Sequence, residues 1–250
     1  MSGEPYDGTY SAAGNDKVKN AIGNFIKEEL SGWKRWEVIW LAAACAVITA
    51  LSVYWHDSLM GIISATTGAA CVVCTGKGKL SAYIFGTVNV VLYAIIAFQA
   101  KYYGEVMLNA LYYFPMEFYG FYVWNKHMNA ETHEVEKKRM NARGRMILLL
   151  AAAAGTAGYG FVLKAMGGAL PFVDSLSTVA SVAAMIISVK MYMEQWIIWI
   201  VVDVVTVVMW AAAFARGNES VATLLMWIVY LGNAVIMYFK WRKEAAENEI

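Results

Sequence analysis

Apolar stretches alternate with short polar segments along most of this chain. A helix rises about 1.5 Å per residue, so about 17 to 20 residues are enough to cross the hydrocarbon core of a bilayer. Eight stretches reach that length: 36–55, 59–75, 80–100, 106–124, 146–163, 172–189, 195–214 and 221–239. The pattern therefore predicts an all-α integral membrane protein with eight transmembrane helices.

The composition supports a chain that is surrounded by lipid. Hydrophobic residues make up 60% of the sequence and charged residues 16%, and the mean hydropathy is +0.48. The net charge is only +1, and no basic patch suits the phosphate backbone of a nucleic acid. We therefore expect the lipid bilayer, and no nucleic acid, as the partner of its surface.

The basic residues gather on one side of the predicted membrane. Lys and Arg are concentrated before the first span, in every second connection and after the last span, and the other connections hold only Lys101, Lys164 and Arg216. Because cytoplasmic loops carry the excess of Lys and Arg, both termini are expected in the cytoplasm and the chain in the cell (inner) membrane. Residues 1–16 lack the apolar stretch of a cleavable signal peptide, so the first span is expected to direct insertion.

Polar segments flank and divide the spans. Residues 1–35 form a predicted cytoplasmic tail, in which apolar residues recur at helical spacing among charged ones: Val18, Ile22, Phe25, Ile26 and Leu30. This spacing indicates an amphipathic helix on the membrane surface, with a partly disordered tail as the alternative. Residues 125–145 form a charged cytoplasmic loop, interpreted as a solvated connection that extends the adjacent helices, and residues 240–250 form a second tail.

The two halves of the chain share an order of features. Each half has a polar residue in the middle of one span, a Phe at the end of that span and a Gly in the next: Asn89, Phe98 and Gly120, then Asp203, Phe214 and Gly232. Residues 59–124 and 172–239 are therefore predicted to form two three-helix repeats, joined by a linker helix at 146–163. The span at 36–55 is an added helix outside the repeats. A single linker helix makes both repeats enter the membrane in the same direction, so the substrate site is expected between them near the midplane.

Polar residues inside the spans are the candidates for the site. An ionisable group at a helix centre costs about 2.5 to 3.5 kcal/mol on insertion scales, so such residues are expected to face the interior. The candidate substrate-binding residues are Asn89, Tyr93, Asn109, Tyr113, Glu117, Asp174, Thr178, Ser181, Trp196, Trp199, Asp203, Tyr230 and Asn233. As the alternative, Trp residues near helix ends form interfacial belts and Ser or Thr side chains only pack helices. Trp36, Trp55, Trp124 and Trp196 are the residues to which the belt alternative applies.

These side chains suit a flat, positively charged nucleoside. Aromatic faces attract cations, and carboxylates and amides pair with ribose hydroxyls or a carboxamide. No nucleophile stands beside a base, and Cys71 and Cys74 form a lone CxxC motif without a second pair or a nearby His. We therefore expect no catalytic residue, no metal site and no cofactor, and a protein that is not an enzyme.

Several short motifs carry a family resemblance over about residues 80–240. They are Phe85-Gly86 with Asn89, Phe98-Gln99, Tyr119-Gly120 with Trp124, Pro171-Phe172 with Asp174-Ser175, and Tyr192, Glu194, Trp196 and Trp199. With these motifs the chain resembles the PnuC-type nicotinamide riboside transporters, vitamin transporters that are similar to the SWEET sugar transporters. The resemblance implies a three-plus-one-plus-three helix arrangement. It also implies uptake by facilitated diffusion (uniport), with alternating access and with trapping of the substrate through phosphorylation by a cytosolic nucleoside kinase.

The substrate and the class keep alternatives at this point. Relatives of this group transport thiamine or riboflavin, and Glu117 and Asp203 favour a cation, nicotinamide riboside or thiamine, over neutral riboflavin. The resemblance favours nicotinamide riboside, but the residues alone do not decide between the two cations. A structural membrane subunit that transports nothing is the alternative of another class. The oligomeric state is left open, a homo-oligomer included.

Overall fold

The computed structural model describes residues 9–167, 171–217 and 221–247. Residues 1–8 and 248–250 of the two predicted tails lie outside the described residues. The helices, in chain order, are α1 (Thr9–Glu29), α2 (Arg35–Tyr54), α3 (Leu59–Lys77), α4 (Ser81–Gln99), α5 (Tyr103–Met107), the π-helix η1 (Leu108–Tyr113), α6 (Phe114–Lys126), α7 (Ala142–Ala165), α8 (Pro171–Val189), α9 (Gln195–Ala215) and α10 (Val221–Glu247). The all-α class is therefore confirmed for the described residues.

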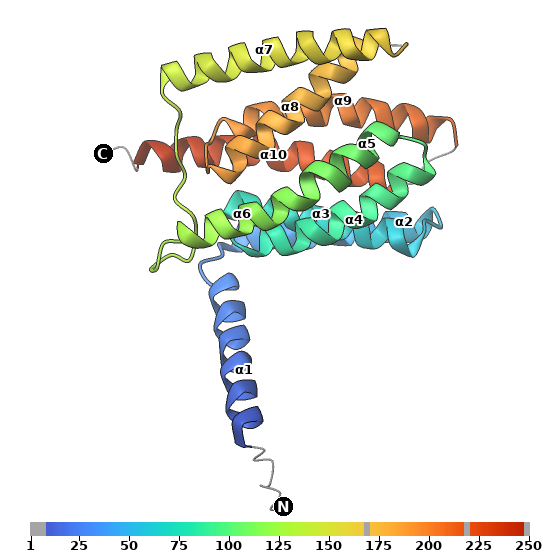
Figure 1. Ribbon diagram of the computed structural model, residues 1–250. Coiled ribbons are helices and arrows are strands. Elements are labelled where there is room, and N and C mark those ends of the chain that lie inside the picture. The colour runs from blue at the N-terminus through green and yellow to red at the C-terminus, as the bar shows by residue number, and fades with distance from the viewer. Residues whose placement is uncertain (1–8, 168–170, 218–220, 248–250) are drawn as a thin grey trace, which may run out of the picture.

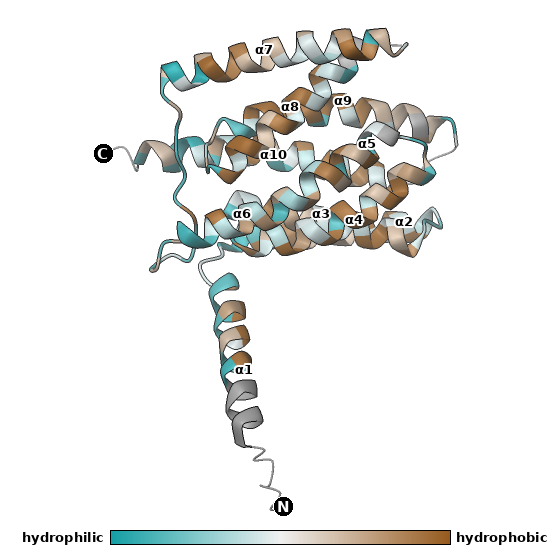
Figure 2. Cartoon of the chain, viewed as in Figure 1, coloured by the Kyte–Doolittle hydropathy of each residue, from teal (hydrophilic) through white to brown (hydrophobic). Residues whose placement is uncertain are grey.

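Six of these helices, α2, α3, α4, α7, α9 and α10, are long and apolar enough to cross a membrane. The other two predicted spans are also helical, since 106–124 falls within the consecutive helices α5, η1 and α6, and 172–189 falls within α8. Large apolar side chains such as Leu149, Phe118 and Val208 are exposed on the outside of the bundle, and Figure 2 shows brown along these outer faces. The chain is a multi-pass membrane protein, whereas the number of eight spans and the SWEET-like arrangement stay predictions.

The helices of the bundle lie side by side along a common direction (Figure 1). Helix α3 packs against α4 and α10, α9 packs against both α8 and α10, and α7 packs against α8. Local sequence sets the helix limits: Ser58 accepts a hydrogen bond from Gly61 N (3.0 Å) to start α3, and Gly78 ends α3 with φ of +86°. A positive φ is accessible to glycine without strain, so the turn into α4 is tight.

The loop before α7 differs from the interpretation made above. Helix α6 ends at Lys126 and α7 begins at Ala142, so the segment between them extends neither helix. It lies across the end of the bundle: Val135 is buried and its N–H donates to Gly78 O (3.0 Å). Lys138 N donates to Met191 O (2.8 Å). The interpretation that this segment extends the adjacent helices was wrong, because its backbone pairs with the α3–α4 turn and with residue 191 instead.

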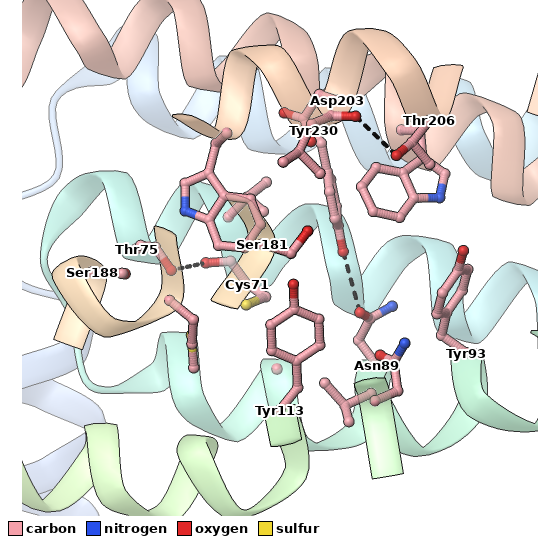
Figure 3. Close-up of a pocket in the computed structure, with 18 of the residues that line it drawn as sticks. Cys71, Thr75, Asn89, Tyr93, Tyr113, Ser181, Ser188, Asp203, Thr206 and Tyr230 are labelled. Carbon is pink, nitrogen blue, oxygen red and sulfur yellow. Dashed lines mark hydrogen bonds between the residues drawn. The ribbon is translucent and has the colours of Figure 1, made fainter. Parts of the chain in front are cut away.

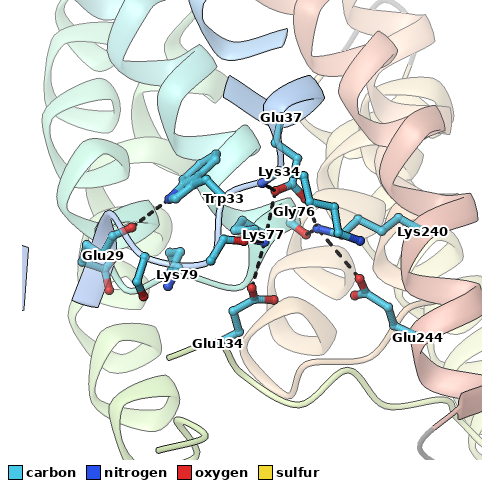
Figure 4. Close-up of polar contacts among 12 residues, drawn as sticks. Glu29, Trp33, Lys34, Glu37, Gly76, Lys77, Lys79, Glu134, Lys240 and Glu244 are labelled. Atoms are coloured by element: carbon cyan, nitrogen blue, oxygen red, sulfur yellow. Dashed lines mark hydrogen bonds and ion pairs between the residues drawn. The ribbon is translucent and has the colours of Figure 1, made fainter. Parts of the chain in front are cut away.

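A cluster of ion pairs closes the same end of the bundle (Figure 4). Lys77 Nζ lies 3.0 Å from Glu37 Oε2 and 2.9 Å from Glu134 Oε1, and Lys240 Nζ lies 2.7 Å from Glu37 Oε1. Lys137 Nζ lies 2.7 Å from Glu134 Oε2. Burial opposes ionisation of Glu134, but its ion pairs with Lys137 and Lys77 outweigh this and hold the pKa of its carboxyl below the ordinary value. The cluster thus joins α2, α3, α10 and the 127–141 segment.

Candidate functional site

A cavity lies inside the bundle, between α3, α4, the α5–η1–α6 series, α8, α9 and α10. Most of the candidate residues line it: Asn89, Tyr93, Asn109, Tyr113, Glu117, Ser181, Trp196, Trp199, Asp203 and Tyr230. Figure 3 shows the hydroxyl groups of Tyr113 and Ser181 pointing toward one another across this space. Residues from both predicted repeats therefore meet at one site, and their role in binding stays a prediction.

Asn89 connects three helices at the wall of the cavity. Its Nδ2 donates to Ser64 O on α3 (2.8 Å), and its Oδ1 accepts a hydrogen bond from the Tyr230 hydroxyl on α10 (3.2 Å). Gly68 makes this contact possible, because a Cβ added there would overlap the Tyr230 hydroxyl oxygen and lie 2.8 Å from Asn89 Nδ2. The amide and the phenol are thereby fixed in position before any ligand enters.

The π-helix η1 sets the direction of the side chains on the opposite wall. Glu105, Asn109, Tyr113 and Glu117 follow one another at steps of four residues and all line the cavity. On a regular α-helix each such step would advance about 40° around the axis, but the wider turn of a π-helix reduces this drift. Asn109 Nδ2 donates to Glu105 O (2.8 Å) within this irregular segment. The π-helix therefore keeps the four side chains facing the same space.

Two glycines allow α4 and α6 to approach closely beside the cavity. A Cβ added at Gly86 would lie 2.5 Å from Glu117 Oε2. A Cβ added at Gly120 would overlap the Tyr83 ring, and that ring packs edge-on against Trp124 with centroids 5.0 Å apart. The Glu117 carboxylate is thus held against the backbone of α4 and cannot shift toward that helix.

Aromatic side chains close both ends of the cavity. At one end the Trp196 ring contacts Trp241 with centroids 5.6 Å apart, and at the other end Tyr93 lies between Trp210 and Trp227, with centroids at 6.2 and 5.9 Å. The interior position of Trp196, which is 3% exposed, excludes it from an interfacial belt.

The other Trp residues proposed for the belt divide in the same way. Trp124 is fully buried, and its indole Nε1 donates to Ser188 O on α8 (3.3 Å). Trp36 and Trp55 are 41% and 50% exposed at the ends of α2. Only these last two residues fit the belt alternative, because a belt residue must reach the membrane–water boundary.

Hydrogen-bonding groups remain available in the cavity wall. The Trp196 Nε1 and the Tyr83 hydroxyl are buried and have no hydrogen-bond partner within the described part of the chain. A buried donor without a partner costs about 1 to 3 kcal/mol. A ligand that offers acceptors to these two groups would recover that cost.

The cavity lining has acidic residues and no basic ones. The carboxyl groups of Glu105, Glu117 and Asp203 line it, and the described lining contains no Lys, Arg or His. Asp203 is 2% exposed in the middle of α9. A positively charged ligand is therefore favoured over an anion.

The remaining candidates do not line the cavity. Asp174 is exposed, and Thr178 Oγ1 donates to Asp174 O (2.9 Å). The first turns of α8, to which both residues belong, pack against α7, where Ser175 Oγ donates to Thr156 O (2.7 Å). Asn233 is fully buried, but it joins helices. Its Oδ1 accepts from Trp40 Nε1 (3.3 Å) and its Nδ2 donates to a backbone carbonyl of α3 (2.9 Å). The sequence pattern placed these three on the right helices but not on the cavity side.

Some cavity residues were missed in the sequence: Cys71, Thr75, Tyr83, Gly86, Glu105 and Trp227. Glu105 falls in the connection between the predicted spans 80–100 and 106–124, although its four-residue spacing from Asn109 is visible in the sequence. Tyr83 and Gly86 precede Asn89 at steps of three, which is the spacing of one helix face. The signal was present for these residues, but no rule separated this face from an ordinary packing face.

Similarity to known proteins covers nearly the whole cavity-forming part of the chain. A family model described as nicotinamide mononucleotide transporter matches residues 58–243. The nicotinamide riboside transporter PnuC of Neisseria mucosa is 40% identical over 222 residues, which is 87% of this chain and 84% of that protein. The protein of the same name from Haemophilus influenzae is 34% identical over 221 residues, 87% of this chain and 95% of that protein. A crystal structure of the vitamin B3 transporter PnuC superposes with a TM-score of 0.81 at 37% identity and covers 90% of this chain and 98% of that chain. The chain therefore belongs to the nicotinamide mononucleotide transporter family, which includes the PnuC membrane transporters.

Proposed function

We propose that this protein carries nicotinamide riboside across the bilayer through the cavity between its helices. One observation carries the proposal: the cavity combines aromatic walls with the carboxylates of Glu105, Glu117 and Asp203 and has no basic residue among its described lining. Nicotinamide riboside is a flat pyridinium cation that bears a carboxamide and a ribose. The named function of the curated relatives agrees with this chemistry.

Each part of this substrate has a counterpart in the cavity. The pyridinium ring would lie against the indole or phenol faces of Trp196, Trp199 and Tyr113, where a cation over a ring gains about 0.5 to 2 kcal/mol. The carboxamide and the ribose hydroxyls would pair with the free Trp196 Nε1, with Asn109 and with the carboxylates. A substrate with both a cationic ring and several hydroxyls uses all of these groups.

The charge of the cavity also separates the riboside from the mononucleotide for which the family model is named. A phosphomonoester would add about two negative charges beside Glu105, Glu117 and Asp203, and the described lining offers no Lys or Arg to neutralise them. Two like charges 4 Å apart repel by about 4 kcal/mol at an effective dielectric constant of 20. This repulsion supports the riboside as the substrate.

Transport would follow from movement of the two predicted three-helix repeats, 59–124 and 172–239, which would expose the cavity to each side in turn. We place both termini in the cytoplasm and the chain in the inner membrane, in accord with the distribution of Lys and Arg. The transport is then facilitated diffusion, and phosphorylation by a cytosolic nucleoside kinase would convert the product into an anion that this cavity repels. A protonophore should leave uptake into liposomes unchanged, and abolition of uptake would overturn the uniport.

Thermal stabilisation of the purified protein tests the substrate. Nicotinamide riboside should stabilise the fold by RT ln(1 + [L]/Kd), whereas nicotinamide mononucleotide at the same concentration should have much less effect. Glu117→Gln and Asp203→Asn should each raise the Kd for the riboside about tenfold or more, which is about 1.4 kcal/mol. Asp174→Asn, an acid on α8 outside the cavity, is the matched control and should leave the Kd unchanged.

The other results of this experiment have defined meanings. Equal stabilisation by the mononucleotide would contradict the charge argument. Stabilisation by thiamine alone would keep the cavity and the transport but replace the substrate, since thiamine also carries a cationic ring. Stabilisation by none of these compounds would favour the structural subunit.

A further inference from the structure

Helix α1 carries an apolar face that no part of the described protein covers. Val18, Ile22, Ile26 and Leu30 are 57%, 55%, 50% and 73% exposed. They lie outside the bundle, on a helix that leaves its end in Figure 1. Apolar side chains this exposed, at helical spacing, are the sequence feature of a helix that binds a surface.

The direction of this face follows from two neighbours on the same side of α1. Phe25 packs against the buried cluster at the end of the bundle that contains Trp124, Val135 and Trp241, and Glu29 accepts hydrogen bonds from the backbone of α4 at its start. Positions 18, 22, 25 and 29 recur at steps of four and three, so they share one side of the helix. The side with Val18 and Ile22 therefore faces the same direction as Phe25 and Glu29, which is toward the level of the spanning helices. Because α1 extends sideways past the bundle, this side has no helix of the bundle beneath it.

The course of α1 places this side parallel to a membrane surface. Figure 1 shows α1 running across the direction of the bundle helices instead of along it, with its C-terminal end at the end of the bundle where the 127–141 segment lies. Helices that span a bilayer are on average within about 20° of its normal. A helix that crosses their direction at their ends therefore runs near the plane of the lipid headgroups.

Contacts at its C-terminal end hold α1 at this angle. Lys79 Nζ donates to Glu28 O (2.9 Å), and Lys77 Nζ donates to Gly32 O (2.6 Å). The Glu29 carboxylate accepts from Leu80 N (3.2 Å) and Ser81 N (2.9 Å). Because these donors belong to the end of α3, the turn after it and the start of α4, the junction fixes α1 relative to the bundle.

We propose that α1 lies in the membrane interface as an amphipathic helix bound to the lipid surface, with Val18, Ile22 and Ile26 inserted below the headgroups. Its opposite side carries Asn24 and Lys27 and would face water. Lys17, Lys19 and Lys27 along the described helix favour anionic headgroups as neighbours. The occupant of the exposed face is thus lipid and not another protein.

Two neighbouring positions give a matched test. Ile22 and Asn24 are both exposed on α1, but two residues place them about 200° apart on the helix. Nitroxide labels would be attached at Ile22→Cys or Asn24→Cys in a chain whose native cysteines are replaced. The labelled protein, checked by its binding of nicotinamide riboside or by its elution as the folded protein, would be examined in nanodiscs of phosphatidylcholine and phosphatidylglycerol. The accessibility of each label to oxygen, which dissolves in lipid, is compared with its accessibility to a water-soluble nickel complex.

The proposal predicts opposite results at the two positions. The label at position 22 should be several-fold more accessible to oxygen than to the nickel complex, and the label at position 24 should show the reverse. Equal and high accessibility to nickel at both positions would mean that α1 lies in water, and would overturn the proposal. Low accessibility of position 22 to both reagents would mean that protein, such as a second copy of this chain, covers the face, and would overturn it as well.

Discussion

The Glu37→Gln substitution tests the ion-pair cluster at the end of the bundle. Glu37 is 1% exposed in the first turn of α2, and its two oxygens lie 3.0 Å from Lys77 Nζ and 2.7 Å from Lys240 Nζ. Glutamine keeps the shape and one carbonyl acceptor but removes the charge that both ammonium groups face. Removing one partner of a buried pair costs about 3 to 5 kcal/mol, because an uncompensated charge stays buried.

The structure places the expected cost at the lower end of this range. Lys77 keeps Glu134 at 2.9 Å, whereas Lys240 keeps only Glu244 at 4.0 Å and Gly76 O at 3.4 Å. The Lys240 side chain is 11% exposed, so some water can reach its ammonium group. We expect a loss of about 3 kcal/mol, which for a chain of this length is a fall in Tm of roughly 6 to 12 °C.

Thermal unfolding in detergent can be followed with a fluorogenic maleimide in a chain whose partly exposed Cys45 and Cys71 are replaced. The remaining Cys74 thiol is 2% exposed, so it should react only after unfolding. Lys243→Met is the matched control, because Lys243 pairs with Glu247 at 3.9 Å with both side chains mostly exposed, and such pairs contribute little. Adding Lys240→Met to Glu37→Gln should restore part of the lost stability. The reasoning is refuted if Glu37→Gln lowers the Tm no more than the control. It is also refuted if Lys240→Met lowers the Tm of the Glu37→Gln protein by as much as it lowers the Tm of the unmodified protein.

Three further predictions address the cavity, a corrected residue and the pH dependence. Gly68→Ala should lower affinity for nicotinamide riboside and cost about 1 to 3 kcal/mol of stability by overpacking against Tyr230. The control Gly158→Ala on α7, whose added Cβ has no neighbour within 4 Å, should be neutral or stabilising. Equal effects of the two substitutions in a binding and an unfolding assay would contradict the prediction. Asn233→Ala should lower the Tm through loss of its two buried hydrogen bonds but leave the ligand Kd unchanged, and a large rise in Kd would return Asn233 to the site. The lowered pKa of Glu134 means that its ion pairs stabilise the fold fully above the ordinary carboxyl pKa of about 4.3, and that this stabilisation is lost as the pH falls through the lowered pKa. Glu134→Gln should therefore flatten the acid side of a plot of Tm against pH. An unchanged acid side would show that Glu134 does not contribute.

The sequence was sufficient to predict the helical segments and to select candidates most of which line the cavity, because both follow from simple energetic costs. A helix in lipid needs an apolar length, and a carboxylate such as Asp203 needs an interior position. The same argument applied to Asn89 and Glu117, which also line the cavity. The resemblance to the PnuC transporters, stated from short motifs, is confirmed by the family match.

The features that the sequence did not predict depend on geometry between distant residues. No local signal marks η1 as a π-helix, so the sequence predicted neither this helix nor the place of Glu105 in the cavity wall beside Asn109, Tyr113 and Glu117. Asn233 has the same chemistry as Asn89 and also joins helices, and only its position in the fold, bonded to Trp40 on α2 and to a carbonyl of α3, shows that it lies outside the cavity. The 127–141 segment looked like a solvated loop because its charges were visible, whereas its pairing with Gly78 was not.

The packing of α7 has a consequence for the order in which the protein is assembled. Among the described helices α7 packs against α8, and only 6% of the most apolar stretch of α7 is buried inside the protein. Its charged residues, Arg143, Arg145 and Lys164, lie near its two ends, and the stretch between them is mostly apolar. Helix α7 can therefore remain in the bilayer as a single helix after synthesis until α8 follows. Helix α9 alone in the bilayer would be unfavourable, because its Asp203 side chain would face lipid unless neighbouring helices shield it. The chain thus inserts α7, which is stable alone, before α9, which needs its partners. When α9 follows, α8 is already present, and α10 completes the packing of α9 directly afterwards.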